Sequence, residues 1–412
     1  MQVVAPVRAA DALLERAARR LAIEFGRRIH VGELVLEFHN GDGRTFRGPT
    51  PGPLAAIQVH DLAALWHVLF GGEVGAGEAY VDGRWSSPDL VQALTLGALN
   101  RDALGVTRGW LRVPASIPRI LAHRARRNTR ANARRNIEAH YDLGNDFYRL
   151  FLDETLTYSS AVFEAPGQSL ADAQRHKYRL MAQHVGLAAG MHVLEIGTGW
   201  GGFALYAAGQ LGCRVTTITI SPAQHELATR RVRDAGLADR VDVQLRDYRD
   251  IAGSYDAVVS IEMLEAVGAE YFDDYFRAID RVLVPGGRAS IQVICVPDVA
   301  YEAQRRGANW IQTYIFPGGL LPSVAEIERS LHHTRLLLVW SQDIAAHYVR
   351  TLATWRQAFL ARVDEVRALG FDTRFVRMWE YYLALSEAGF ATGLVQDQQL
   401  VLEKRRGSFL QP

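Results

Sequence analysis

A strand-like apolar segment that ends in closely spaced glycines is the part of this 412-residue sequence best suited to bind a small molecule. Residues 193–202 read VLEIGTGWGG, with Gly197, Gly199 and Gly202 in a G-x-G-x-x-G pattern. Glycines at this spacing after a strand let a ligand approach the backbone where the next helix begins. The pattern alone fits a dinucleotide, whose pyrophosphate would lie on the turn, and also a ligand that carries no phosphate.

The polar residues that follow the turn argue against a dinucleotide. A dinucleotide site has an acidic residue at the end of the second strand, about 20 residues after the glycines, where it binds the ribose hydroxyls. Here the second predicted strand ends in TITISPAQ, which offers Thr219, Ser221 and Gln224 but no carboxylate. The ribose of NAD would therefore lack its usual partner.

The acidic residues lie instead where a cationic ligand needs them. Glu195 stands two residues before the first glycine, where its charge would repel a pyrophosphate but attract an amine or a sulfonium. Asp247 and Tyr248 end the third predicted strand and suit the amino group and the ring face of an adenine. S-adenosylmethionine has these positive groups and an adenosine without phosphate. We therefore interpret the turn as a binding site for S-adenosylmethionine.

Longer motifs resemble those of a known enzyme family. The segments AHYDLGNDFYRLFLDETLTYSSAVFE (139–164), VVSIEMLEAVGAEYFDDYF (258–276) and YIFPGGLLPS (314–323) are similar to cyclopropane-fatty-acid-phospholipid synthases and the related mycolic acid cyclopropane synthases. The N-terminal GEAYVDGRWSSPDLVQAL (77–94) is similar to the extra N-terminal domain of the bacterial phospholipid enzymes. The resemblance implies methyl or methylene transfer from S-adenosylmethionine to the double bond of unsaturated phospholipid acyl chains, forming a cyclopropane fatty acid.

The resemblance also implies which residues surround the donor. Together with the residues derived above, the expected cofactor-binding set is Tyr158, Ser159, Glu195, Gly197, Gly199, Gly202, Thr219, Ser221, Gln224, Asp247 and Tyr248.

Family members use a bicarbonate ion as a base, held by Cys, Glu, His and Tyr side chains and by backbone. This sequence matches only part of that set: Glu265 and Tyr348 are retained and the backbone position is Ile294, but Ser160 and Gln292 stand at the Cys and His positions. Serine and glutamine can hydrogen-bond an anion, but neither titrates near neutral pH. The expected catalytic set is Glu265, Tyr348, Ser160, Gln292 and Ile294, and bicarbonate binding stays open.

The reaction itself sets further demands on the site. An isolated C=C bond is a poor nucleophile, so catalysis depends on alignment and on stabilising a carbocation. Loss of a proton from the new methyl group closes a ring, whereas a hydride shift before proton loss leads to a methylene branch. Either product needs a base beside an apolar site without water. Glu262, near Glu265, is a second carboxylate that either joins this site or is a buried acid paired with an arginine.

The elements that must position these residues follow from the alternation of strands and helices. Apolar segments such as HVLEIG, CRVTTITI, VDVQLRD, YDAVVSIE and GRASIQVICV alternate with helical patterns from about residue 180 onward. This alternation predicts an α/β fold with a doubly wound, Rossmann-like class I methyltransferase sheet and helical cap insertions. Aromatic residues are dense between Trp310 and Phe390, where they line an acyl tunnel or fill the core of the cap.

Composition predicts three parts in the chain. Residues 1–118 suggest a smaller mixed α/β domain of the lipid-binding type, residues 119–135 a basic linker or helix, and residues 136–412 the methyltransferase domain. The basic segment carries no acid and is either a solvated helix or a contact for an anionic membrane surface. Nucleic acid is not expected, because no aromatic residues interleave with the charges. The arginines expected at the membrane are Arg124, Arg126, Arg127, Arg130, Arg134 and Arg135.

The overall composition is that of a soluble globular protein. The net charge is +1, and two cysteines fit a reducing compartment. No signal-type segment, membrane span or metal-ligand spacing is evident, so we expect a cytoplasmic protein peripherally associated with the inner face of the membrane and without a metal. The oligomeric state is open, with a homodimer as one alternative. A small-molecule C-methyltransferase and a catalytically silent lipid- or nucleotide-binding protein are the competing functional hypotheses.

Overall fold

The computed structural model describes residues 5–104 and 143–407, which fall into two compact units. One unit comprises residues 1–121, 307–311 and 363–392, and the other comprises residues 122–306, 312–362 and 393–412. The basic segment 119–135 and its six arginines lie outside the described residues. No helix in the two described ranges is both long and apolar enough to cross a membrane.

The first unit is built on a four-stranded sheet with the strand order β2-β1-β3-β4. Leu34, Leu36 and Phe38 alternate with exposed or partly exposed residues along β1, as expected for a strand with one face in the core. β1 pairs in parallel with β3, so the sheet is mixed. The strands are β1 (Val31–Phe38), β2 (Gly43–Arg47), β3 (Thr50–Val59) and β4 (Trp85–Ser86), and the helices between them are α1 (Ala5–Gly26), α2 (Ala63–Val81) and α3 (Leu90–Leu99).

Two helices from late in the chain complete this first unit. They are α15 (Val363–Ala368) and α16 (Thr373–Ala391), and α16 packs on α2 and α3. The ring of Tyr381 on α16 lies 5.3 Å from that of Tyr80 and 4.8 Å from that of Trp310. Tyr80 also donates a hydrogen bond of 2.8 Å to Glu380. The compact units thus differ from the division predicted from composition, in which residues 136–412 form one domain.

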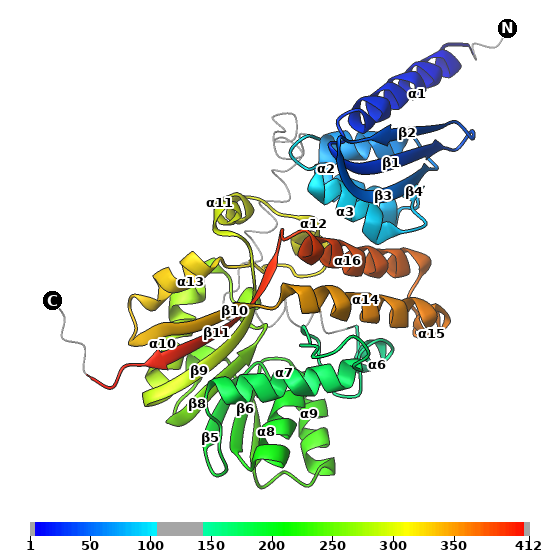
Figure 1. The fold of residues 1–412 in the computed structure, drawn as a ribbon. Coiled ribbons are helices and arrows are strands. Elements are labelled where there is room, and N and C mark those ends of the chain that lie inside the picture. Colours follow the sequence, from blue (N-terminus) through cyan, green and yellow to red (C-terminus); the bar gives the residue numbers. More distant parts are fainter. Residues whose placement is uncertain (1–4, 105–142, 408–412) are drawn as a thin grey trace. The chain divides into compact units, whose positions relative to one another are not determined.

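The second unit contains a seven-stranded sheet with the order β10-β11-β9-β8-β5-β6-β7 (Figure 1). β5 to β9 run parallel, and β10 and β11 are antiparallel to their neighbours. The strands are β5 (His192–Ile196), β6 (Arg214–Thr219), β7 (Val241–Leu245), β8 (Tyr255–Ile261), β9 (Leu283–Cys295), β10 (Leu336–Asp343) and β11 (Gln396–Lys404). The alternation of strands and helices expected from the sequence is therefore confirmed.

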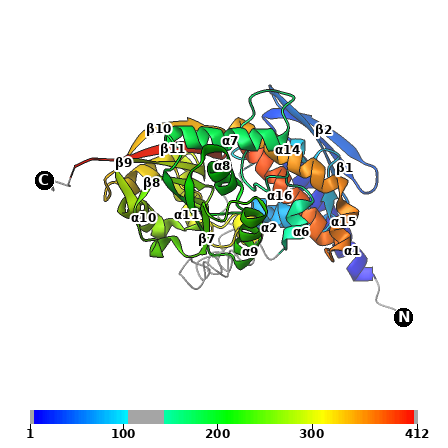
Figure 2. The ribbon, with the colours of Figure 1, turned by 90° about the horizontal axis from the view of Figure 1, so that it is seen from below.

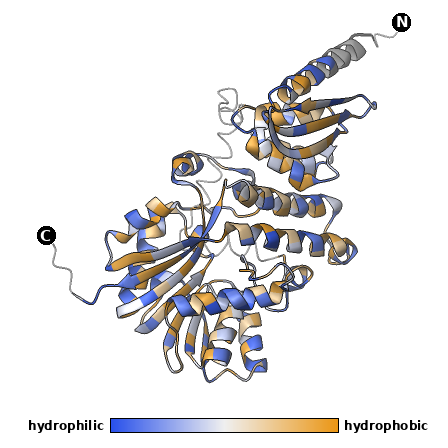
Figure 3. Ribbon diagram, viewed as in Figure 1, coloured by the Kyte–Doolittle hydropathy of each residue, from blue (hydrophilic) through white to orange (hydrophobic). Residues whose placement is uncertain are grey.

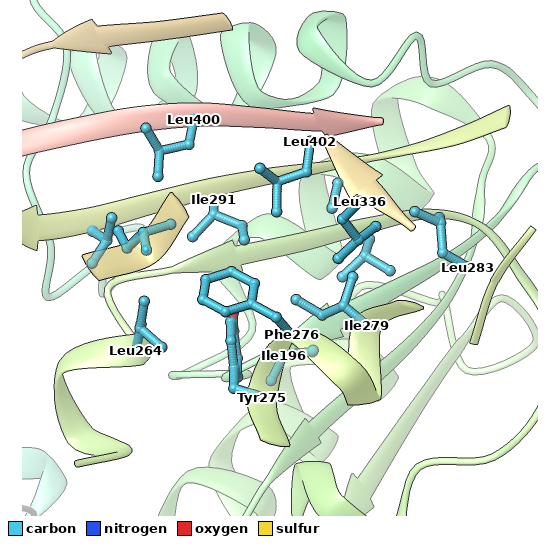
Figure 4. Packing of buried hydrophobic residues seen from close by; sticks show 14 of the residues in the cluster. Ile196, Leu264, Tyr275, Phe276, Ile279, Leu283, Ile291, Leu336, Leu400 and Leu402 are labelled. Carbon is cyan, nitrogen blue, oxygen red and sulfur yellow. The ribbon is translucent and has the colours of Figure 1, made fainter. Parts of the chain in front are cut away.

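Helices cover both faces of this sheet, as the two views in Figures 1 and 2 show. On one face Val193 and Val259 pack with side chains of α7, α8 and α9, and on the other face Leu194 and Val258 pack with side chains of α10 and α13. Figure 4 shows part of this second core, to which Phe276, Ile279 and Ile291 belong. Neighbouring residues along a central strand thus pack into opposite cores. For this reason apolar residues follow one another along the central strands (Figure 3). The helices are α6 (Asn145–Arg149), α7 (Leu170–His184), α8 (Gly202–Leu211), α9 (Pro222–Asp234), α10 (Phe272–Val282), α11 (Asp298–Arg306), α13 (Val324–Leu331) and α14 (Ala345–Ala361), with α12 (Trp310–Tyr314) divided between the two units.

The carboxyl ends of β5 to β9 meet at one edge of the sheet because these five strands are parallel. Ile261 at the end of β8 pairs with Gln292 on β9, so the residue after Ile261 lies beside Gln292. Ile294 on β9 pairs in turn with Asp397 on β11. This register brings residues from distant parts of the sequence to the edge where open α/β sheets bind their ligands.

Candidate active site

The glycine turn after β5 is open toward a ligand at one of its glycines and closed at another. Gly197 and Gly199 have φ values of 98° and 52°, a region that favours glycine. A Cβ atom at Gly199 would meet no atom within 4 Å, whereas one at Gly202 would lie 2.2 Å from the hydroxyl of Tyr178. The turn can therefore receive a ligand at Gly199, while Gly202 serves the packing of α8 against α7.

Glu195 lies buried beside this turn. It accepts a hydrogen bond from the hydroxyl of Thr217, which also lies 2.8 Å from the hydroxyl of Thr198. Burial raises the pKa of Glu195 to about 8. A positively charged ligand near this carboxyl would favour its ionised form.

Thr219, Ser221 and Gln224 lie at the end of β6 and the start of α9. The hydroxyl of Thr219 donates to Oε1 of Gln224 over 2.8 Å, and Ser221 is the N-cap of α9, accepting from the backbone N–H of Gln224 over 3.3 Å. The backbone N–H groups of Gly197 and Thr198 bond to the carbonyl of Ile218 one strand away. These contacts hold the three residues next to the glycine turn, and the capping bond gives Ser221 a structural role there.

Asp247 and Tyr248 follow β7. Asp247 forms an ion pair with Arg249, with contacts of 2.8 and 2.6 Å to Nε and Nη2. The ring of Tyr248 packs edge-on against Tyr275 at 5.6 Å. Because the carboxylate of Asp247 already has a partner within the chain, its contact with an adenine stays a prediction.

Tyr158 and Ser159 lie on the loop that precedes α7. The ring of Tyr158 stacks on Trp355 of α14 at 5.2 Å and meets Tyr148 edge-on at 5.3 Å. The hydroxyl of Ser159 accepts a hydrogen bond of 2.6 Å from the buried ammonium of Lys177. The loop thus presents an aromatic surface on one side and a polar contact on the other.

Arg231 of α9 joins this loop to the glycine turn. Its guanidinium donates to the backbone carbonyls of Thr155, at 3.0 Å, and Trp200, at 2.6 Å. A third bond, of 3.3 Å, goes to the carbonyl of Glu154. One side chain therefore fixes two segments of the predicted donor site relative to each other.

Glu262, which the sequence left undecided, is the centre of a hydrogen-bond cluster. Its Oε1 accepts from the backbone N–H of Ser160 at 2.9 Å and from the amide nitrogen of Gln292 at 2.8 Å. Its Oε2 accepts from the hydroxyl of Tyr348 at 2.8 Å. Burial raises the pKa of this carboxyl, and the charge of Lys177 opposes that shift. Three residues of the expected catalytic set thus converge on one carboxylate.

Glu265 lies on the next turn, the 3-10 segment Leu264–Ala266. The backbone N–H of Ile294 donates to its Oε1, whereas its Oε2 is buried and has no hydrogen-bond partner among the residues that the structure describes. Burial, together with the charge of Glu262, raises the pKa of Glu265 to about 8. The structure therefore brings together Glu265 and Ile294, two residues of the expected catalytic set.

The hydroxyl of Ser160 does not take part in this cluster. It donates to the carbonyl of Ala161 at 3.0 Å, and the backbone N–H of the same residue makes the contact with Glu262. A backbone N–H is available at this position whatever the side chain is. The loss of cysteine there thus leaves one anion-binding donor unchanged.

Lys177, Asp397 and Gln399 are buried polar residues of this site that sequence reasoning missed. Gln292 donates to Asp397 at 3.2 Å and accepts from Gln399 at 3.0 Å. Burial lowers the pKa of Lys177 to about 8 and raises that of Asp397 well above its usual value. The available signal was the polar run Gln396–Gln399 directly before the apolar residues Leu400–Leu402 of the same strand. Across the described ranges, no group of three or more His, Cys, Asp or Glu residues could hold a metal ion.

Comparisons with known proteins identify a matching family and similar enzymes. Residues 128–400 match the sequence profile of a family described as mycolic acid cyclopropane synthetase. The tuberculostearic acid methyltransferase UfaA1 of Mycobacterium tuberculosis is 45% identical over 80% of this chain and 79% of its own length. The cyclopropane-fatty-acyl-phospholipid synthase of Escherichia coli is 33% identical over 88% of this chain and 90% of its own.

A solved structure is similar as well. The mycolic acid cyclopropane synthase CmaA1, in a complex with SAH and CTAB, aligns with a TM-score of 0.62 at 29% identity and covers 66% of this chain and 98% of its own. The fold predicted from the sequence, a doubly wound class I methyltransferase sheet, is thereby confirmed.

Proposed function

The chain belongs to the mycolic acid cyclopropane synthetase family and is an S-adenosylmethionine-dependent methyltransferase, and from this premise we propose that it methylates a double bond of unsaturated fatty acyl chains in phospholipids. The observation that carries the proposal is the pair of carboxylates, Glu262 and Glu265, at the same sheet edge as the open glycine turn. A donor turn and a buried base are the two parts that methylation of an olefin requires.

The chain's own residues fit the donor. Gly199 leaves space for a ligand against the backbone, and Glu195 offers a buried carboxyl for a positive group. We assign the binding of the donor's amino acid part to Gly199 and Glu195, and the binding of its ribose to Thr219 and Gln224 at the end of the next strand. When bound, S-adenosylmethionine supplies an electrophilic methyl carbon on a positively charged sulfur.

Aromatic rings beside the carboxylates suit the acyl substrate. Tyr158 stacks on Trp355, and Trp355 meets Tyr348 edge-on at 6.1 Å. Rings packed in this way exclude water and present π-electrons that stabilise a nearby cation. We therefore expect the double bond to lie between these rings and Glu262, where a carbocation is protected until it loses a proton.

We favour a methylene-branched product over a cyclopropane ring. The relative with 45% identity is named for tuberculostearic acid, which is a methyl-branched fatty acid, and it is more similar to this chain than the Escherichia coli cyclopropane synthase at 33%. The cyclopropane product, which the sequence resemblance implies, is the second candidate, since the family profile and the solved structure are named for it.

Lipid analysis tests the proposal. In a host with monounsaturated phospholipids, expression should add the mass of one CH₂ group to the unsaturated chains and leave the saturated chains unchanged. Proton NMR then separates vinylidene signals of a methylene branch from the high-field signals of a ring. The same host without the gene is the control, and the absence of any mass gain on monounsaturated lipid would contradict the proposal.

We also propose that the basic segment 119–135 holds the enzyme at an anionic membrane surface on the cytoplasmic side. Each arginine near such a surface contributes about 1 kcal/mol, and salt weakens this attraction. The full chain should co-sediment with anionic vesicles at low salt and much less at high salt. Replacing Arg126, Arg127 and Arg130 with glutamine should weaken binding. Equal sedimentation of the variant and the unchanged protein would contradict the role of these arginines, and no binding at all would instead favour a soluble small-molecule substrate.

A further inference from the structure

We propose that the carboxylate of Glu262 is itself the base that removes the proton from the methylated acyl chain, so that turnover needs no bicarbonate. The inference rests on the proposed function, and it names the group that completes the reaction. The sequence resemblance assigned Ser160, Gln292 and Tyr348 to a bound anion. In the structure, the hydrogen-bond donors of these three residues contact the carboxylate of Glu262 instead.

The hydrogen bonds around Glu262 leave no place for a second anion among the same donors. The backbone of Ser160 and the hydroxyl of Tyr348 each have one hydrogen to donate, and each donates it to Glu262. The amide nitrogen of Gln292 has two hydrogens and contacts Glu262, the carbonyl of Ser160 and Asp397. The N–H of Ile294 is taken by Glu265. A free anion here would face two carboxyl groups without an available donor from this set.

The backbone at Glu262 supports a functional role for this side chain. Glu262 has a φ of 49°, one of two positive φ values among the non-glycine residues that the structure describes. Such a conformation costs about 1 kcal/mol or more for a residue with a Cβ atom, and it persists where the surroundings impose it. Glycine would be the relaxed choice after β8. The strain is offset by the three hydrogen bonds that the carboxylate accepts.

The charges around Glu262 act on the pKa of its carboxyl group in opposite directions. Burial raises the pKa of the carboxyl, which favours uptake of a proton, while the ammonium of Lys177 on α7 keeps the ionised form accessible. Asp397 on β11 and Glu265 also face the cluster and oppose a further negative charge. A base is most effective when its pKa lies close to the working pH.

The proposed step is one proton transfer. A C–H bond of the cationic acyl chain breaks, and the proton goes to an oxygen of Glu262. The electron pair of that bond stays on the chain, where it becomes either the C=C bond of a methylene branch or the last C–C bond of a ring. The neutral carboxylic acid returns its proton to solvent before the next turnover.

The first test compares turnover with and without bicarbonate. The full-length enzyme acts on vesicles of monounsaturated phospholipid in buffer freed of carbon dioxide and in the same buffer with bicarbonate added, and the two rates should agree. Glu262→Gln keeps the shape but not the base, and should lower kcat by about 100-fold or more. Glu328→Gln, at an exposed position on α13, is the matched control and should keep the rate. Unchanged donor binding by calorimetry establishes that the Glu262→Gln substitution has not disrupted the fold.

Glu262→Gly provides a second readout that does not depend on turnover. Glycine suits the positive φ and leaves the donors of Ser160, Gln292 and Tyr348 open to a small anion. ¹³C-bicarbonate should therefore bind to this variant and not to the unchanged enzyme in NMR titrations, and bicarbonate or formate should restore part of its activity.

The outcomes separate this inference from the proposed function. Loss of turnover in buffer without bicarbonate, bicarbonate binding to the unchanged enzyme, or full activity of Glu262→Gln would each overturn the role of Glu262 and leave lipid methylation intact. An unchanged enzyme that modifies no unsaturated lipid would overturn the proposed function instead. In that case, comparing bicarbonate binding to Glu262→Gly and to the unchanged enzyme still tests whether Glu262 occupies the position of the anion.

Discussion

Glu265 differs from Glu262 in what its carboxyl group contacts. Glu262 accepts three hydrogen bonds, whereas Glu265 accepts one, from Ile294, and keeps a buried oxygen without a hydrogen-bond partner in the described part of the chain. An unpartnered buried oxygen is costly when it carries charge. The two carboxyl groups, although close in sequence, therefore lie in different surroundings: three donors contact Glu262, whereas one oxygen of Glu265 has no donor among the described residues.

The raised pKa of Glu265 predicts a pH-dependent cost to stability. The pKa is 4.5 in the unfolded chain and about 8 in the folded one, so the neutral carboxyl favours folding at low pH and this contribution is lost as the pH rises toward 8. Glu265→Gln does not titrate. Its free energy of unfolding should therefore gain about 2 kcal/mol relative to the unchanged protein between pH 6 and pH 8.

Urea denaturation of both proteins at pH 6, 7 and 8 measures this difference. A part of the difference that is the same at all three pH values comes from replacing the carboxyl group with an amide and not from titration. A difference that stays constant across the three pH values would show that Glu265 has an ordinary pKa.

At the scale of single helices, α9 positions two segments of the predicted donor site. It begins at the Ser221 cap beside the predicted ribose position and carries Arg231 in its last turn, where the guanidinium reaches the loop before α7 and the glycine turn. α14 acts similarly from the other side of the loop, since Thr351 accepts from the backbone N–H of Ala161 at 3.2 Å and Tyr348 reaches Glu262. Residues of α9 and α14 thus both bind the loop that precedes α7.

Arg231→Ala should loosen this loop. The change leaves the carbonyls of Glu154, Thr155 and Trp200 without their guanidinium donor, and should cost about 2 kcal/mol of stability. Amide hydrogen exchange of residues 154–160 should become faster, and the KM for the donor should rise. Arg230→Ala is the matched control, because Arg230 is exposed and pairs with Glu226 on the same helix. Equal exchange rates in the two variants would contradict the positioning role of Arg231.

At the scale of the whole molecule, a helix from late in the chain completes the first unit. α16 supplies Tyr381, whose ring lies between Tyr80 and Trp310, and Arg377, which donates to the carbonyls of Tyr80 and Trp85. A Cβ atom at Gly77 of α2 would lie 2.5 Å from the ring of Trp310, so the glycine permits this close packing. The N-terminal residues are therefore one part of a unit that needs three segments.

This connection predicts that residues 1–121 are unstable when expressed alone. Without α16 the apolar face of α2 and α3 is exposed, and the fragment should unfold without a cooperative transition and bind a hydrophobic dye. Joining residues 307–311 and 363–392 to the fragment by flexible linkers should restore cooperative thermal unfolding. Cooperative unfolding of residues 1–121 by themselves would show that α16 is not needed.

Much of the architecture was predictable because it depends on local patterns. The strands β5, β6 and β8 are short segments rich in apolar or β-branched residues, each preceded closely by a glycine, and the G-x-G-x-x-G pattern follows the first of them, so the central part of the sheet follows from the sequence. The convergence of Ser160, Gln292 and Tyr348 on Glu262 was harder to predict from the sequence. It depends on the pairing of β8 with β9 and of β9 with β11, which brings Gln292, Asp397 and Gln399 together from distant parts of the chain.

The sequence by itself determined the class of fold, the glycine turn and the family of chemistry, because each of these depends on residues that are neighbours along the chain. Only the tertiary structure decided which carboxylate receives the donors of Ser160, Gln292 and Tyr348, and which segments complete the first unit. The physical reason is the same in both cases. A hydrogen bond or a packed ring depends on distances in space, and residues far apart in the chain acquire those distances only when strands pair and helices pack.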